Sequence, residues 1–220
     1  MMKYRQIGNA ELWVSPISLG GNIFGYALNE KQTKGLLDFS IDNGVNFIDT
    51  ADVYSEGESE RIIGKAVQGE RDKWIIASKV GLHSNGNSTG LGKKKDILKR
   101  IEKSLKRLGT DYIDLYQIHH YDPATPIGEI LGAFEKLIAD GKIRYAGCSN
   151  YFIEELIKSK TYSKMNNISG YSSIQLHYNI LKRDVEEEIL PFCKRKRIGV
   201  IVYGALGRGI LTNKYLYPEN

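Results

Sequence analysis

The sequence predicts an α/β fold built on a parallel sheet. Short apolar runs typical of strands alternate with longer segments whose apolar residues recur at helical spacing, along nearly the whole chain. Glycines follow several of the helical segments, where a left-handed residue ends a helix. Parallel neighbours need a crossover helix between them, so this alternation favours a parallel sheet.

The apolar runs predict seven strands for this sheet. They cover Val14–Leu19, Val45–Asp49, Trp74–Lys79, Tyr112–His119, Ile143–Ser149, Ser172–His177 and Gly199–Tyr203. Upstream, Tyr4–Ile7 and Glu11–Val14 flank the turn Gly8-Asn9-Ala10, which predicts an N-terminal β-hairpin. In a barrel, such a hairpin would close the bottom.

The helical segments between the strands are amphipathic. The clearest places Ile97, Ile101, Leu105 and Leu108 on one face, and Asp96 is expected to cap its start. A second segment carries Ile127, Ile130, Leu131, Phe134, Leu137 and Ile138. The glycines expected to end helices are Gly44, Gly109, Gly141 and Gly199.

Two closures of such a sheet compete, an open doubly wound sheet and a closed (β/α)8 barrel. A dinucleotide-binding open sheet usually carries Gly-x-Gly-x-x-Gly directly after its first strand. This chain has Leu19-Gly20-Gly21-Asn22 at that point, with different spacing and no immediate helix. The dinucleotide-binding open sheet is therefore disfavoured.

Polar side chains stand at or near the carboxyl ends of the expected strands from the second onward. They are Asp49, Lys79, His119, Ser149 with Asn150, Gln175 and Tyr203. Successive members lie 26 to 40 residues apart, about one strand–helix unit. Active sites of (β/α)8 barrels lie at this end of the strands, so the pattern predicts a site there.

Strand parity predicts that the charged members of this set converge. Alternate strand residues face the barrel axis, so Asp49, Lys79 and His119 each end an inward-facing column. Burying these groups separately is costly, so we expect them to meet and pair. Singly, each also has a structural interpretation: Asp49 as an acceptor for loop amides, Lys79 as a rim residue reaching water, and His119 or His120 as an ordinary buried histidine.

Composition excludes several classes of protein. The chain has 220 residues, of which 41% are hydrophobic and 26% charged, which is globular rather than disordered. No apolar run approaches the roughly 18 residues of a membrane span, and Cys148 and Cys193 are too few for a disulfide framework, so a reducing cytoplasm is expected. The net charge of +5 includes two basic clusters without any nucleic-acid-binding motif, Lys93–Lys95 and Lys194–Arg197. We expect no nucleic acid, membrane or metal partner.

The residues around the strand ends resemble the signature motifs of the aldo-keto reductases. The matching segments are Phe47–Tyr54, Ile75–Val80, Asp114–His119, Gly141–Asn150 and Val202–Gly209. They follow one another in the family's order and cover most of the chain, so together they are highly specific.

The resemblance implies a (β/α)8 TIM barrel and hydride transfer from NADPH, or alternatively NADH, to an aldehyde or ketone. The family's catalytic residues correspond to Asp49, Tyr54, Lys79 and His119, which is chosen over His120 because it directly follows the strand motif. Charge that builds on the carbonyl oxygen needs a proton donor within about 3 Å. We expect Tyr54 to donate the proton and Lys79 to favour its ionised form. Asp49 would orient Lys79, and His119 would hydrogen-bond the carbonyl oxygen.

The resemblance also places the nicotinamide. Its carboxamide is expected on Ser149, Asn150 and Gln175, with Tyr203 stacked on the ring. Amide and hydroxyl groups match the donor and acceptor of a carboxamide, and stacking decides which ring face offers the hydride.

Backbone amides around Leu206 and Gly207 are expected to approach the cofactor pyrophosphate, since small residues permit close contact. The family's common Ser-Pro at this point reads Gly204-Ala205 here. One hydroxyl contact is therefore lost, and Gly204 is expected to bind without a side chain.

We expect residues 1–220 to form a single barrel domain of about seven strand–helix units that lacks its C-terminal part. The resemblance implies that the missing part would bind the adenosine ribose of the cofactor. It would also supply a loop that contacts the substrate. Two other functions stay open: a regulatory subunit that senses nicotinamide redox state, as potassium-channel β-subunits do, and a truncated, non-catalytic barrel.

Overall fold

The computed structural model describes residues 2–82, 89 and 92–215 of the chain. Strands β1 (Arg5–Gln6) and β2 (Trp13–Val14) form an antiparallel hairpin. All other strands form one parallel sheet whose order follows the chain. They are β3 (Leu19–Gly20), β4 (Phe47–Asp49), β5 (Ile75–Val80), β6 (Ile113–Ile118), β7 (Ile143–Ser149), β8 (Ser173–His177) and β9 (Gly199–Tyr203).

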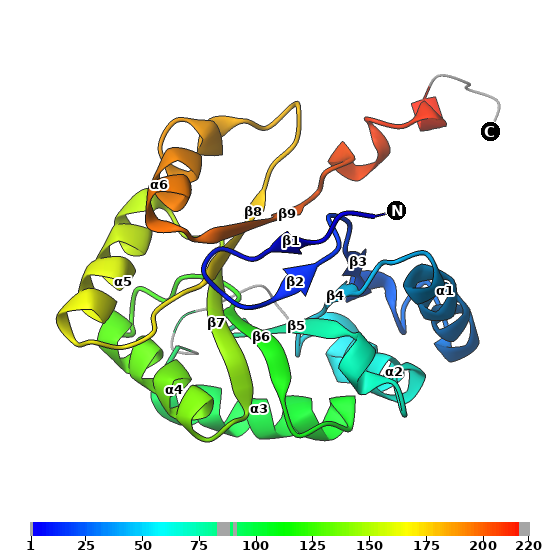
Figure 1. Ribbon diagram of the computed structural model, residues 1–220, viewed down its shortest axis with the longest axis horizontal. Helices are drawn as coiled ribbons and strands as arrows, with labels where there is room; N and C mark the ends of the chain where they lie inside the picture. The colour runs from blue at the N-terminus through cyan, green and yellow to red at the C-terminus, as the bar shows by residue number, and fades with distance from the viewer. Residues whose placement is uncertain (1, 83–88, 90–91, 216–220) are drawn as a thin grey trace.

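Helices cover the outer side of this sheet, which curls as part of a (β/α)8 barrel (Figure 1). They are α1 (Glu30–Asp42), α2 (Glu58–Ala66), α3 (Lys94–Leu108), α4 (Ile127–Ala139), α5 (Ile153–Met165) and α6 (Ile189–Lys196). Successive helices α1 to α5 pack side by side. The predicted α/β barrel with seven strands is thereby confirmed. Within the described residues, no helix has the length and apolar character that crossing a membrane requires.

Two apolar clusters hold the fold together. The larger lies between the sheet and its helices and includes Ile76, Tyr116 and Phe134. The smaller lies inside the curled sheet. Its buried members are Ile7, Ala10, Leu12, Val14, Phe47, Ala77, Leu115 and Ile201. The strand residues that parity predicts to face the barrel axis therefore do so. Those nearer the amino ends of the strands, such as Phe47, Ala77 and Leu115, are apolar and pack together.

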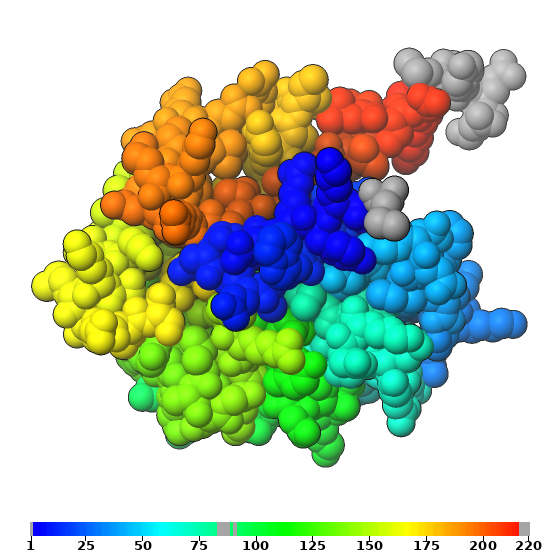
Figure 2. All heavy atoms as spheres, viewed as in Figure 1, coloured from blue at the N-terminus to red at the C-terminus, as the bar shows by residue number. Residues whose placement is uncertain are grey.

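The N-terminal hairpin closes the amino-terminal end of the barrel, as predicted. Four of its residues belong to the interior cluster, and its turn at Gly8 lies against Ser172 and Gly199, where β8 and β9 begin. Figure 2 looks onto this end and shows the hairpin lying across its middle. The carboxyl ends of the strands therefore lie at the opposite end of the barrel.

The first strand of the sheet differs from the prediction. Val14 pairs with Arg5 in the hairpin, and the barrel strand is only Leu19–Gly20, paired with Ile48 and Asp49. Between them Ser15 donates from its hydroxyl to the carbonyl of Ile17, and proline follows it. Proline cannot donate to a ladder, so the apolar run breaks into two short strands. The other six strands appear with bounds shifted by two residues at most.

Two predicted helix ends also need correction. Gly199 does not end a helix but begins β9, and α6 ends instead on Arg197, whose φ is 54°. Asp96 does not cap α3, because the N-cap is Lys93 and Asp96 lies in the first turn. Gly44, Gly109 and Gly141 do follow α1, α3 and α4, each with positive φ.

Gly199 is required by the contact between hairpin and sheet. A Cβ at this position would lie 2.6 Å from Ile7 Cγ2 and 2.8 Å from the Gly8 nitrogen. We expect Gly199→Ala to lower the free energy of unfolding by about 1–3 kcal/mol, because the hairpin must shift. The matched control is Gly132→Ala in α4, where no atom lies within 4 Å. It should raise stability by about 0.5–1 kcal/mol. Urea unfolding of both variants measures the contrast, and equal effects would contradict the proposed clash.

Candidate functional site

A buried ammonium group lies at the carboxyl end of the sheet. Lys79, at the end of β5, is 1% exposed, and its Nζ lies 2.7 Å from Asp49 Oδ2 at the end of β4. The same nitrogen donates to the carbonyl of Thr50 at 2.9 Å and lies 3.3 Å from the Tyr54 hydroxyl. The three charged or phenolic groups that the motifs singled out therefore meet at one nitrogen atom.

The protonation of Lys79 follows from these contacts. Burial alone would lower the pKa of Lys79, but the charges of Asp49 and Tyr54 and the hydrogen bonds to them outweigh burial and raise it. Lys79 is thus a cation at neutral pH despite having almost no contact with water. Gln117 of β6 adds a longer contact, with Nε2 3.5 Å from Asp49 Oδ1.

His119 lies beside the tyrosine, directly after β6. Its amide donates to the carbonyl of Val80 at 2.7 Å, and its ring meets the Tyr54 ring edge-on at 5.9 Å. Burial, and then the positive charge of Lys79, lower the pKa of His119 to about 3. The imidazole is therefore neutral at physiological pH, and a neutral imidazole still offers one N–H donor.

His120, the neighbour of His119, also belongs to this group of side chains. Its ring stacks on that of His119 at 5.5 Å and 21°, and its Nε2 lies 3.3 Å from Asn150 Nδ2. His120 therefore links the group around Lys79 to the group at the ends of β7 and β9.

Asn150 is the centre of that second group. It follows β7 with φ 57°, and its Nδ2 donates to the carbonyl of His119 at 3.2 Å and to Ser149 Oγ at 3.0 Å. Its Oδ1 accepts from the Tyr203 hydroxyl at 2.8 Å. The structure thus brings together Ser149, Asn150 and Tyr203 as predicted, through hydrogen bonds among themselves.

Gln175 completes the residues predicted to hold a carboxamide. It lies in β8, paired with Ser149 of β7, and is 4% exposed. Its side-chain amide has no hydrogen-bond partner within the part of the chain that is described. A nearly buried amide with free donor and acceptor fits a carboxamide such as that of nicotinamide.

The segment after β9 is built from left-handed turns. Gly204, Gly207 and Arg208 have φ of 68°, 56° and 56°. The Gly207 amide already donates to the Gly204 carbonyl at 2.9 Å. Of the two amides predicted to approach a pyrophosphate, that of Leu206 has no acceptor among the described residues.

His177 is a site residue that the motifs did not single out. It pairs with Tyr203 across β8 and β9, and the two rings stack at 5.1 Å and 13°. A Cβ on Gly204 would lie 2.7 Å from two atoms of the His177 ring. The glycine that replaces the family's serine therefore makes room for this imidazole. Parity could have found His177, since it lies two residues after Gln175 on the same strand face.

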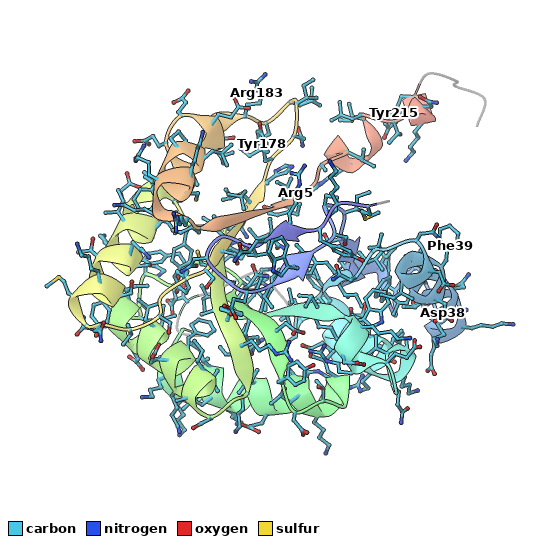
Figure 3. The ribbon with its side chains drawn as sticks, viewed as in Figure 1. Arg5, Asp38, Phe39, Tyr178, Arg183 and Tyr215 are labelled. Atoms are coloured by element: carbon cyan, nitrogen blue, oxygen red, sulfur yellow. The ribbon has the colours of Figure 1, made fainter. Side chains whose placement is uncertain are left out.

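The connection after β8 is fixed by its own polar contacts. The Tyr178 hydroxyl donates to Glu186 Oε1 at 2.5 Å, and Arg183 binds both oxygens of Glu186. Figure 3 labels Tyr178 and Arg183 on this connection, above α6. These residues, with Asn179 and Ala205, line a cavity of about 470 Å³ beside the Gly204 segment.

Known proteins are similar to this chain along most of its length. The model of the Aldo/keto reductase family matches residues 16–220. The chain is 38% identical over 221 residues to aldo-keto reductase YhdN of Bacillus subtilis (strain 168). It is 36% identical over 223 residues to a putative voltage-gated potassium channel subunit beta of Schizosaccharomyces pombe. The matches cover 97% and 96% of this chain but only 65% and 64% of those two proteins.

Solved structures give the same fold. The holo form of aldo-keto reductase AKR11C1 from Bacillus halodurans aligns with a TM-score of 0.83 at 34% identity, over 100% of this chain and 72% of that one. Glycerol dehydrogenase AKR11B4 from Gluconobacter oxydans aligns with a TM-score of 0.85 at 32% identity, over 99% and 68%.

The neutral state of His119 predicts a pH dependence of stability. The unfolded chain takes up a proton on this histidine below its ordinary pKa of 6.5, whereas folded His119 does so only near its pKa of about 3. Stability is therefore lost as pH falls through this window, by roughly 1 kcal/mol per pH unit. We expect His119→Gln to remove this part of the slope in urea unfolding between pH 6 and pH 4. Parallel slopes in the two proteins would rule out a neutral, buried His119.

The contact between His177 and Gly204 predicts that substitutions at these two positions have coupled effects on stability. Gly204→Ala should lower the free energy of unfolding by about 1–3 kcal/mol, and adding His177→Ala should recover about 1 kcal/mol of that loss. The control is Gly207→Ala, which also has positive φ but no atom closer than 3.5 Å to the added Cβ. His177→Ala should recover nothing in that background. Recovery of the same size in both backgrounds would contradict the direct contact.

Proposed function

Because this chain belongs to the aldo/keto reductase family, we propose that it is an oxidoreductase that exchanges a hydride between a nicotinamide cofactor and a small carbonyl compound. One observation carries the proposal. A buried ammonium, Lys79, contacts both the Asp49 carboxylate and the Tyr54 hydroxyl, next to a neutral imidazole. This arrangement suits proton transfer to an oxygen on which negative charge develops.

In the proposed reduction, Tyr54 donates its hydroxyl proton to the carbonyl oxygen. Lys79 stabilises the phenolate left behind, since its ammonium lies 3.3 Å from that oxygen. Asp49 keeps Lys79 charged and oriented through its 2.7 Å contact. His119 stays neutral and donates an N–H to the carbonyl oxygen, so it adds no competing positive charge. In the reverse reaction, Tyr54 takes up the proton of the alcohol.

A bound nicotinamide cofactor would supply or accept the hydride. We propose that Ser149, Asn150 and Gln175 hold its carboxamide and that Tyr203 stacks on its ring, backed by His177. The Leu206 amide would donate to the pyrophosphate, and Gly204 and Gly207, which have no side chain, would let the pyrophosphate come close to the backbone. NADPH is the cofactor that we propose, with NADH as the alternative that a parallel titration tests.

A regulatory protein is the second candidate. The similarity to a putative voltage-gated potassium channel subunit beta supports it, since the 36% identity to that relative is close to the 38% identity to aldo-keto reductase YhdN. A regulator would bind the cofactor but need not turn over a carbonyl compound.

One pair of measurements separates the candidates. NADPH and NADH are titrated by protein fluorescence, and turnover of an aromatic aldehyde is followed by the loss of cofactor absorbance. Binding with turnover supports the reductase, and binding without turnover supports the regulator. A chain that shows neither would overturn both and leave a non-catalytic barrel.

Tyr54→Phe tests the proton donor. We expect turnover to fall by about 10²- to 10⁴-fold, because no other group occupies the position of the phenolic proton. Cofactor affinity should stay within about twofold, since the proposed cofactor ligands lie at the ends of β7, β8 and β9. The control is Tyr4→Phe on the exposed hairpin, which should leave both quantities unchanged. A Tyr54→Phe variant with wild-type turnover would refute the assignment.

A further inference from the structure

A second buried ion pair lies behind the loop that carries Tyr54. Arg100 of α3 places Nε 2.6 Å from Asp52 Oδ2, and its Nη2 donates to the carbonyl of Leu82 at 2.9 Å. The Asp52 side chain is 3% exposed and that of Arg100 23%. One guanidinium thus binds two loops at once.

These two loops bear the proposed proton donor and its cation. Asp52 precedes Tyr54 by two residues, and Leu82 follows Lys79 by three. The Asp52 amide also donates to the Lys79 carbonyl at 3.2 Å. Arg100 is therefore a bridge from α3 to both sides of the contact between Tyr54 and Lys79.

The contact that this bridge supports is sensitive to small shifts. The Tyr54 hydroxyl and Lys79 Nζ are 3.3 Å apart, already beyond the common range for an N–H···O bond. Displacing the Tyr54 loop by a few tenths of an ångström would break it. Tyr54 is followed by two left-handed residues, Ser55 and Glu56, with φ of 47° and 56°. Left-handed backbone is unfavourable for these residue types, so the loop needs external support to hold this conformation.

The ion pair of Asp52 and Arg100 is better suited to fixing the position of the loops than to stabilising the fold. Burial raises the pKa of Asp52, although its hydrogen bond to Arg100 and the nearby positive charges oppose this. A buried ion pair contributes little net stability compared with apolar residues of the same size. A guanidinium, however, directs separate N–H groups at a carboxylate and a carbonyl from a rigid planar fork, whereas the donors of an ammonium share one rotatable nitrogen.

We propose that Asp52 and Arg100 are positioning residues that hold Tyr54 against Lys79 for proton transfer. The proposal rests on the proposed function of Tyr54. Neither residue touches the proposed cofactor ligands, so their loss should lower kcat and leave cofactor affinity unchanged.

The chain offers a matched control on the same helix. Arg107 lies two turns further along α3, and its Nε donates to Glu60 Oε2 at 2.7 Å. The Glu60 side chain is fully buried and that of Arg107 17% exposed, so this ion pair is as buried as the first. Arg107 bonds to side chains of α2 and α3 and packs on Gly57, without a hydrogen bond to the backbone of either loop among the described residues. Methionine keeps the aliphatic part of this packing, so Arg107→Met should lower stability without moving Tyr54.

The experiment compares Arg100→Met, Arg100→Lys and Arg107→Met in the full chain. We expect Arg100→Met to lower kcat by about 10- to 100-fold, the loss typical of a catalytic group displaced by about 1 Å. Arg100→Lys should recover part of it, because lysine restores the ion pair but not the bond to Leu82. Arg107→Met should keep kcat within about twofold while lowering the Tm as much as Arg100→Met. Cofactor affinity should stay within about twofold in all three.

Equal losses of kcat in Arg100→Met and Arg107→Met would overturn the proposal, as would unchanged kcat in Arg100→Met. A readout without turnover separates this outcome from failure of the proposed function. Hydrogen exchange of the amides of Asp52 and Tyr54 should accelerate at least tenfold in Arg100→Met and stay unchanged in Arg107→Met. If the wild-type chain has no turnover, the proposed function fails. Unchanged exchange in Arg100→Met would then still refute the support of this loop by Arg100.

Discussion

A buried ammonium group determines which side chains and charges can lie beside it at the carboxyl end of this barrel. Lys79 is almost fully withdrawn from water, so its charge is tolerable only with Asp49 in direct contact and a carbonyl beside it. These partners come from β4 and its following loop, which must therefore lie next to β5 in register. The neighbouring His119 is neutral because burial, and then the positive charge of Lys79, lower its pKa.

The side chains inside the barrel change from apolar to polar along the strand direction. Below Asp49 and Lys79, the same inward columns carry Phe47, Ala77 and Leu115, which pack on the hairpin. Above them, the columns end in polar groups that bond to one another rather than to the apolar interior. Packing in the apolar half fixes the separation and twist of the strands. The positions of the polar side chains at the carboxyl ends of the strands follow from that packing. Loops at the upper end can then vary without disturbing the core.

The sequence was most informative where burial and periodicity act together. Strands flanked by helices on one side and an apolar interior on the other stand out as apolar runs, and strand parity placed Asp49 and Lys79 on one axis. The first barrel strand could not be predicted, because two residues between Pro16 and a turn carry no periodic pattern. The contacts of His177 with Tyr203 and of Arg100 with Asp52 depend on strand register and helix rotation. Strand register and helix rotation cannot be recognised from any short sequence pattern.

The hairpin has a consequence for how the chain folds. Its turn at Gly8 lies against Gly199, about 190 residues later, so the hairpin contacts a strand that is synthesised long after it. Contacts of such long range close a large loop and slow the search for the native state. During synthesis the apolar side of the hairpin stays without its contact to β9 until that strand has left the ribosome. Its two-residue strands expose little edge in that interval, which limits pairing with other nascent chains.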